Sequence, residues 1–276
     1  GARSELGGGE ARATNHGSAM MILDCHVHLP SPGLGRAWEW APCTPDVDAA
    51  VRYLRRCGVE RAIANSMRGE VATTPEEMMA GNDEAAAQAR RHVMLIAACL
   101  VNTNFAEEAL SEIKRCHTEL GMVWLGELCG YVGGYTYDTE AFARAMRLAS
   151  DLNLVVQIHC EGWEEMSRLC REFPRVPFVL AHLGDPPEEC RRRCELAARH
   201  ANLHLDISGH GFQRMGILEL AVRCAGPERV LFGSDYTIND PAGVIVRVQL
   251  ADFDGRTKEL ILGGNAMRLL AERGVA

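Results

Sequence analysis

The sequence has no long hydrophobic run and few aromatic residues. Its longest uninterrupted apolar stretch, Val93–Val101, spans nine residues, about half of the ~18 that a membrane-spanning helix needs. No basic-then-apolar leader precedes Met20, so no signal peptide is predicted. We therefore expect a protein that is neither embedded in a membrane nor exported.

Positive charge is also scarce, since 29 Lys and Arg face 37 Asp and Glu for a formal net charge of −8. The only run of three basic residues is Arg191–Arg193, so no electropositive surface for nucleic acid is predicted. The eleven cysteines lack the paired spacing of zinc sites, and this pattern is typical of thiols kept reduced. We expect a cytoplasmic protein with no nucleic-acid or membrane partner.

The chain divides into a leader and a regular region. Residues 1–19 are rich in Gly, Ala, Ser and Arg without an apolar period, and we expect a disordered leader or tag there. Residues 20–276 alternate short apolar runs with amphipathic stretches. The apolar runs are Met21–His26, Arg61–Asn65, Val93–Val101, Met122–Leu128, Leu154–His159, Pro177–His182, Asn202–Ser208 and Arg229–Ser234. The amphipathic stretches are Asp46–Cys57, Pro75–Arg90, Phe105–His117, Thr139–Asp151, Trp163–Phe173, Pro187–His200, Phe212–Cys224, Lys258–Leu262 and Asn265–Arg273.

This alternation predicts the fold class. Strands that are apolar almost throughout and are joined by helices indicate a buried parallel sheet. Eight such units in about 250 residues predict an α/β fold, a single (β/α)8 TIM-barrel domain over 20–276. A doubly wound sheet is the alternative, but it would carry a glycine-rich phosphate loop after its first strand. Residues 24–30 read DCHVHLP instead.

Polar residues stand at the ends of five of the apolar runs, where a barrel of this kind carries its active site. His26 and His28 are two residues apart, so strand alternation turns both imidazoles to one face. The other four residues are Glu127, His159, His182 and Asp235. Such a buried cluster costs several kcal/mol without compensation. A divalent cation supplies that compensation, and the donor types suit Zn²⁺, with Mn²⁺ or Fe²⁺ as alternatives.

The segments DCHVHLP, QIHC, LAHLGD, LFGSDY and GGNAMRLL together resemble the amidohydrolase superfamily. The resemblance is to its amidohydrolase-related branch (amidohydrolase 2 type), which includes metal-dependent hydrolases and decarboxylases of the aminocarboxymuconate-semialdehyde type. It implies a metal held by His26, His28, His159 and Asp235, with His182 as a ligand of a second metal or as a catalytic group.

Glu127 decides between one ion and two. In binuclear members of the superfamily a carboxylate at this position bridges two ions. If Glu127 bridges, one ion takes His26, His28, Glu127 and Asp235, and the other takes Glu127, His159 and His182. The alternative is a carboxylate that orients a histidine. The segment GELCGY also resembles TatD-type nucleases, which share this ligand set.

The main functional prediction is a metal-dependent hydrolase of a small molecule with an amide, ester or lactone bond. Metal-activated water would attack, Asp235 would transfer its proton, and His182 or a second ion would stabilise the oxyanion. The alternatives are a nonoxidative decarboxylase, a TatD-like phosphodiesterase, and a catalytically silent metal-binding barrel. A homodimer is the default assembly for a soluble barrel enzyme.

Candidate substrate residues follow the strand ends. Aromatic side chains on these loops either wall an apolar substrate or pack the loops down. An acid there could bind a hydroxyl or cationic group, and Arg68 a carboxylate. The candidates are Trp38, Trp40, Tyr131, Glu161, Trp163, His210 and Arg68. Asp206 shares a face of its run with Ser208, and we expect it to contact a ligand histidine.

Overall fold

The structure is a computed structural model that describes residues 20–31, 34, 46–160 and 162–275. The predicted leader 1–19 lies outside the described residues, and so do the candidate substrate residues Trp38, Trp40 and Glu161. No helix of the described part is both long and apolar enough to span a bilayer. The described cysteines are all free thiols.

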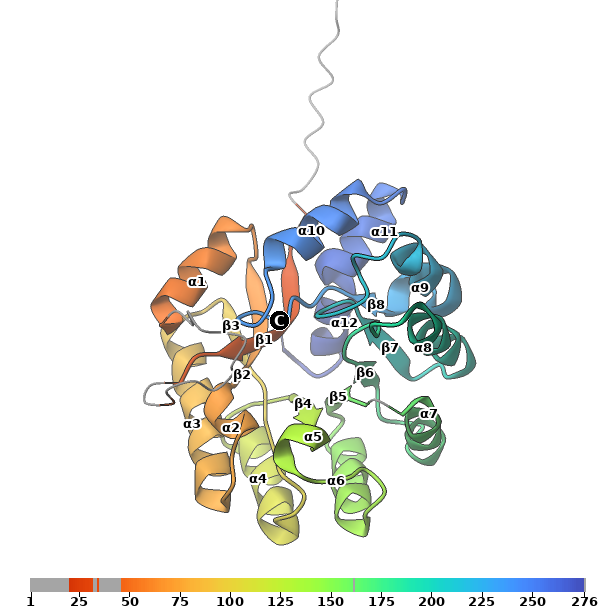
Figure 1. Ribbon diagram of the computed structural model, residues 1–276. Helices are drawn as coiled ribbons and strands as arrows, with labels where there is room; N and C mark the ends of the chain where they lie inside the picture. Colours follow the sequence, from red (N-terminus) through yellow and green to blue (C-terminus); the bar gives the residue numbers. More distant parts are fainter. Residues whose placement is uncertain (1–19, 32–33, 35–45, 161, 276) are drawn as a thin grey trace, which may run out of the picture.

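The described chain forms a ring of parallel strands surrounded by helices (Figure 1). The strands are β1 (Leu23–Leu29), β2 (Arg61–Ser66), β3 (Leu95–Ala97), β4 (Trp124–Cys129), β5 (Val155–His159), β6 (Phe178–Leu180), β7 (Leu203–Asp206) and β8 (Val230–Leu231). The helices of the first half are α1 (Val47–Arg56), α2 (Met67–Glu70), α3 (Pro75–Arg91), α4 (Ala106–Thr118), α5 (Gly130–Gly133) and α6 (Glu140–Asp151). Those of the second half are α7 (Trp163–Glu172), α8 (Pro187–Arg199), α9 (Ile217–Ala225), α10 (Pro241–Leu250), α11 (Gly255–Glu259) and α12 (Asn265–Ala271), with a 3₁₀ turn Pro227–Arg229 and a π turn Leu260–Gly264.

Hydrogen bonds join the strands into a barrel. The ladders run in the orders β1-β2-β3 and β4-β5-β6-β7-β8, all parallel. Between the two groups, the amide of Cys99 donates to the carbonyl of Trp124 at 2.8 Å. At the other seam, the amide of Asp235 donates to the carbonyl of His26 at 2.9 Å. The predicted parallel α/β barrel is thus confirmed, and its first strand is tied to the segment that follows its last.

Two apolar clusters fix this arrangement. The larger one lies between strands and helices, and it includes Leu54 of α1 and Leu205 of β7. The smaller one combines side chains of β1, β2, β4, β5, β6 and β8 with those of α12. Because these strands are spread around the ring, side chains that meet there lie inside the barrel. This apolar cluster, which includes Trp124 and Leu269, therefore fills one part of the interior and leaves the carboxyl ends of the strands for polar groups.

Some helices differ from the sequence prediction. α9 begins at Ile217 rather than Phe212, because Gly216 adopts a left-handed conformation (φ 85°) just before it. The segment Pro241–Leu250 forms α10, which the sequence did not indicate, since its β-branched residues obscure the helical period. The Asp240 side chain caps it by accepting a hydrogen bond from the amide of Ala242 at 2.9 Å.

Candidate metal centre

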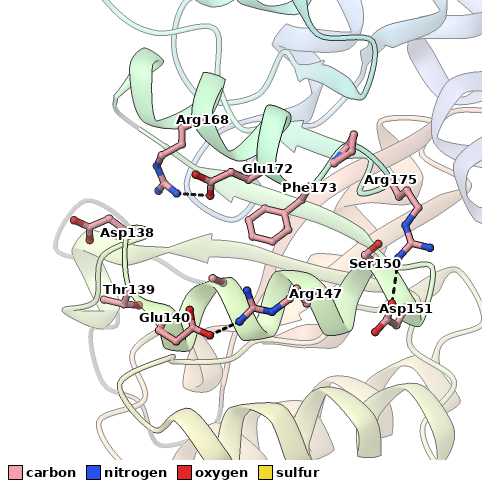
Figure 2. A pocket seen from close by; sticks show the side chains of 12 residues that line it. Asp138, Thr139, Glu140, Arg147, Ser150, Asp151, Arg168, Glu172, Phe173 and Arg175 are labelled. Atoms are coloured by element: carbon pink, nitrogen blue, oxygen red, sulfur yellow. Dashed lines mark hydrogen bonds and ion pairs between the residues drawn. The ribbon is translucent and has the colours of Figure 1, made fainter.

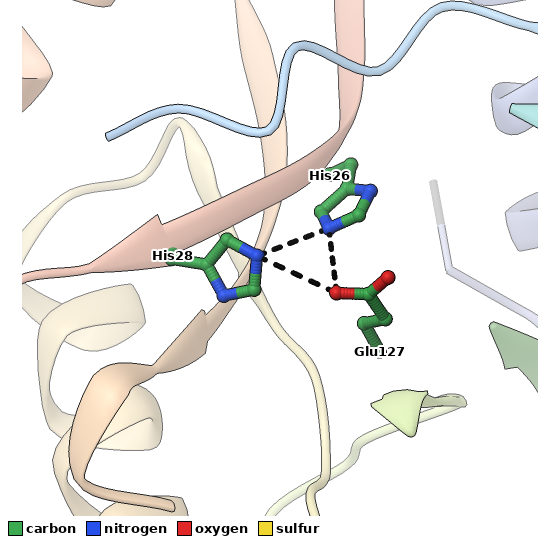
Figure 3. Close-up of side chains that lie close together, drawn as sticks. All are labelled: His26, His28 and Glu127. Atoms are coloured by element: carbon green, nitrogen blue, oxygen red, sulfur yellow. Dashed lines mark hydrogen bonds and ion pairs between the residues drawn. The ribbon is translucent and has the colours of Figure 1, made fainter. Parts of the chain in front are cut away.

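His26, His28 and Glu127 converge at the carboxyl end of the barrel (Figure 3). Nε2 of His26 lies 3.1 Å from Nε2 of His28 and 3.1 Å from Oε2 of Glu127. Oδ1 of Asp235 lies 3.1 Å from Nε2 of His28 and 3.7 Å from Nε2 of His26. Donors bonded to one ion at about 2.1 Å in tetrahedral geometry stand about 3.4 Å apart. These four donor atoms, brought together from β1, β4 and the segment after β8, fit that spacing.

The chemistry of His26 also fits a cation. Its Nδ1 donates a hydrogen bond to Oδ2 of Asp206 at 2.7 Å, so loss of the second ring proton would leave a lone pair on Nε2. That lone pair would face the carboxylate of Glu127 at 3.1 Å. Two acceptors at this distance repel each other unless a proton or metal ion lies between them. The contact predicted for Asp206 is present, and it orients the His26 ring so that Nε2 faces the site.

The buried charges of the site depend on one another. Burial acts to lower the pKa of His26, but the charges of Glu127 and Asp206 outweigh it and raise that pKa well above its ordinary value. Burial acts to raise the pKa of Glu127, yet His26 and His159 hold it well below its usual range. The pKa of Asp235 is lowered as well, against burial, by its hydrogen bond with His28 and the charge of His26. Protons on the imidazoles thus balance the carboxylates, and a divalent cation would do the same.

The second oxygen of Glu127 faces a different pair of histidines. Oε1 lies 3.1 Å from Nδ1 of His159 and 3.6 Å from Nε2 of His182. The donor atoms of Glu127, His159 and Cys129 lie within 4.8 Å of one another. One carboxylate therefore spans two groups of donors.

A hydrogen-bond network holds His182 and Asp206 in place. The hydroxyl of Ser208 donates to Oδ2 of Asp206 at 2.7 Å and lies 3.0 Å from Nδ1 of His182. Because its one hydrogen is used, this hydroxyl accepts from His182, which leaves Nε2 of His182 as an acceptor. Gln157 donates a further hydrogen bond to Asp206 at 3.1 Å.

Backbone strain is concentrated at two site residues. His182 (φ 64°) and Asp235 (φ 61°) both adopt the left-handed conformation, which costs a non-glycine residue roughly 1–3 kcal/mol. Beside them, Gly209 (φ 62°) passes so close that a Cβ there would lie 2.3 Å from Nδ1 of His182. The surrounding hydrogen bonds stabilise a backbone that aims these side chains into the site.

The donors line a cavity of about 460 Å³. Its lining residues are His28, Glu70, Glu127, Cys129, Tyr131, His159, His182, His210, Asp235, Ile238 and Asn239. Of the candidate substrate residues, Tyr131 and His210 belong to this lining. The Tyr131 ring meets His159 edge-on at 4.9 Å between centroids.

Two other candidate substrate residues are not among the described lining residues of this cavity. Trp163 begins α7, and the Arg192 guanidinium lies 5.4 Å above its ring. Arg68, on α2, pairs with Glu84 of α3 at 3.1 Å and does not line the cavity.

Sequence reasoning missed four lining residues, the apolar Ile238 and three that carry polar or thiol groups. Glu70 is buried on α2, and its Oε2 has no hydrogen-bond partner in the described part of the chain. Asn239 donates to Oδ2 of Asp235 at 2.9 Å. Cys129 stands two residues after Glu127, so strand alternation could have placed it on the same face. Glu70 had no such signal, because α2 is a single unpredicted turn.

A larger cavity of about 680 Å³ lies outside the barrel between α6 and α7 (Figure 2). Its arginines are paired with acids: Arg168 with Glu172 at 2.8 Å, and Arg175 with Asp151 at 3.2 Å. Neither histidine nor cysteine is among its described lining residues. Its described lining offers neither imidazole nor thiol, and the acids of these pairs are bound to arginine, so the site of interest remains the smaller cavity.

Fold and site define a parallel α/β barrel with a candidate metal centre, and the comparisons give its family. The amidohydrolase family model matches residues 23–271, and the chain belongs to this family. Among solved structures, a putative amidohydrolase from Staphylococcus aureus has a TM-score of 0.74 at 14% identity, with 91% of this chain and 100% of that chain covered. The search of curated proteins found no match.

Two further neighbours have a stated activity. The 5-carboxyvanillate decarboxylase from Sphingomonas paucimobilis has a TM-score of 0.73 at 15% identity, covering 92% of this chain and 99% of that one. A dihydroxybenzoic acid decarboxylase from Polaromonas sp. JS666, with bound manganese and 2-nitroresorcinol, has a TM-score of 0.73 at 16% identity, covering 91% and 97%. At these identities the likeness shows a common fold.

Proposed function

We propose that this protein is a metal-dependent hydrolase of an uncharged small molecule and that Glu127 bridges two divalent cations. The observation that carries the proposal is the position of Glu127, whose two oxygens face two separate donor groups. His26, His28 and Asp235 would hold the first cation with Oε2. His159 and His182 would hold the second with Oε1. Zinc and manganese both suit nitrogen and oxygen donors.

The cations would supply a water of lowered pKa and a Lewis acid for the scissile bond. Asp235 is placed to accept a proton on Oδ1, since Asn239 holds its other oxygen at 2.9 Å. Burial lowers the pKa of His182, and its Nε2 is an acceptor. Both points favour His182 as a ligand over His182 as a donor to an oxyanion.

The charge of the cavity supports an uncharged substrate. Glu70, Glu127 and Asp235 line it, whereas its described lining holds neither Arg nor Lys. An anionic substrate would have to approach three carboxylates and would depend on the cations alone for compensation. The unpartnered Oε2 of Glu70 would accept a hydrogen bond from a hydroxyl or amide N–H of the substrate.

Nonoxidative decarboxylation is the second candidate, and the comparisons support it better than they support hydrolysis. The neighbours with a stated activity are decarboxylases of aromatic acids, one of them crystallised with manganese. In that case one cation would bind the substrate carboxylate, and Glu127 would orient His26 or His159 rather than bridge.

A paired assay separates the two candidates. The protein is loaded with Zn²⁺ or Mn²⁺ and offered amides, esters and lactones on one side and hydroxybenzoic acids on the other, with hydrolysis products and CO₂ both measured. Hydrolysis that needs two equivalents of metal and disappears in Asp235→Asn would support the proposal. Release of CO₂ by a protein that binds one equivalent of metal, with the same metal content in Glu127→Gln, would support the decarboxylase instead of the hydrolase.

A further inference from the structure

We infer that Cys129 is a thiolate ligand of the second cation, so that this position selects zinc, cobalt or cadmium over manganese. The inference rests on the two-cation site proposed above, and it adds a sulfur donor to the ligands of the second cation. The sequence indicated nitrogen and oxygen donors only. The structure adds a sulfur atom on the side of Glu127 that faces His159.

The position of Cys129 follows from strand pairing. Cys129 ends β4, and its Cα is the register partner of His159 at the end of β5. It also stands two residues after Glu127, on the same face of the strand. The result is that the sulfur, a nitrogen of His159 and a carboxylate oxygen of Glu127 lie within 4.8 Å of one another.

The surroundings of the sulfur match a ligand better than an inert core thiol. Cys129 is only 5% exposed, yet it lines the cavity. A thiolate beside Glu127 and Glu70 is unfavourable by itself, and a divalent cation between these groups removes that penalty.

Cys160 provides a matched comparison within the same pair of strands. It directly follows His159 and is as buried as Cys129. Its thiol, however, donates to the carbonyl of Gly162 at 3.3 Å, and it does not line the cavity. A mutation of Cys160 therefore removes a buried thiol near the site without removing a donor.

The two positions then differ in metal preference. The first has two imidazoles and two carboxylates, which accept manganese as well as zinc. The second has a thiolate, which favours softer cations. We expect the full-length protein to bind about one equivalent of Mn²⁺ tightly and two of Zn²⁺ or Co²⁺.

Cobalt reports the ligand directly, because thiolate coordination gives a strong charge-transfer band in the near ultraviolet. The metal-free, full-length protein is titrated with Co²⁺ as wild type, Cys129→Ser and Cys160→Ser, and bound cobalt is measured by elemental analysis. Wild type and Cys160→Ser should bind two ions and show the band. Cys129→Ser should lose the band and bind the second ion at least tenfold more weakly.

Other outcomes separate this inference from the proposed function. Two cobalt ions without the band, or a band that Cys129→Ser retains, would overturn the thiolate ligand and leave the two-cation hydrolase standing. A single ion without the band would overturn both. Should Cys129→Ser fail to fold, zinc-edge X-ray absorption of the wild type decides alone, since a zinc ion without sulfur neighbours would refute the inference.

Discussion

Asp206 accepts a hydrogen bond of 2.7 Å from Nδ1 of His26, and this contact determines which nitrogen of His26 faces the cavity. The same carboxylate accepts from Ser208 and Gln157, so its position is fixed by β7 and β5 together. A ligand imidazole whose far nitrogen is held by a carboxylate is both oriented and more basic.

Asp206→Asn should therefore weaken metal binding without abolishing the fold. We expect the affinity for the first cation to fall by about 10-fold to 100-fold, measured by competition with a chromophoric chelator. Asp48→Asn is the control, because Asp48 is an exposed acid that pairs with Arg91 on the outside of the barrel. Equal affinities of the two variants would mean that Asp206 does not support His26.

Metal binding should strengthen as the pH rises. The raised pKa of His26 keeps its imidazole protonated in the metal-free protein at neutral pH, so a cation must displace that proton. Affinity should rise by roughly tenfold per pH unit for each proton released, up to the pKa of His26. Calorimetry in two buffers of different ionisation enthalpy counts the protons. Binding that releases no protons would contradict the assignment.

The stability of the metal-free protein, in contrast, should fall as the pH rises through the pKa of His26. The pKa of His26 is higher in the folded protein than its ordinary value of 6.5, so protonated His26 stabilises the fold, fully at pH values below 6.5. This stabilisation is lost as the pH rises through the pKa of the folded state. The pKa of Glu127 is lowered in the folded protein, so ionised Glu127 stabilises the fold at pH values above 4.5. This stabilisation is lost as the pH falls through the lowered pKa. The increase in melting temperature on adding Zn²⁺ should be larger at pH 8 than at pH 6, and an increase independent of pH would contradict this linkage.

Glu70→Gln tests substrate recognition separately from metal binding. Burial raises the pKa of Glu70 to about 7, so its carboxylate is fully charged only above neutral pH. At such a pH, replacing it by a neutral amide should weaken a charge-assisted hydrogen bond by about 1.5 kcal/mol, which corresponds to a KM roughly tenfold higher. Metal content should stay unchanged. Glu84→Gln is the control, since Glu84 pairs with Arg68 outside the cavity. Loss of metal in Glu70→Gln would make Glu70 a ligand instead.

Alanine variants of two glycines distinguish the effect of backbone strain from the effect of crowding at the site. Gly209 (φ 62°) and Gly121 (φ 71°) are both left-handed, but only Gly209 abuts the His182 ring, while an added Cβ at Gly121 meets nothing within 4 Å. Gly121→Ala should lose about 1 kcal/mol of unfolding free energy, and Gly209→Ala should lose more, because its Cβ must also displace the His182 ring. Only Gly209→Ala should also lose binding of the second cation. If Gly121→Ala reduced metal binding equally, crowding of His182 would not be the cause.

The sequence predicted the barrel and the strand ends well, because parallel strands and their period of two are local patterns. His26 and His28 could be placed on one face from their spacing alone, and Asp206 from its alternation with Ser208. Glu70 could not, since it lies on α2, one turn with no periodicity. Trp163 is not among the described lining residues of the cavity, because nearness in sequence to β5 does not determine the direction that α7 gives its first side chain.

The hydrogen bond between Asp235 and His26 places both residues where the first strand meets the end of the last. The first group of donors would therefore be complete only after the chain from β1 to the segment following β8 has been synthesised and has closed into a ring. Capture of the first cation would then report ring closure, and a fragment ending before β8 would lack Asp235 and should hold that cation more weakly.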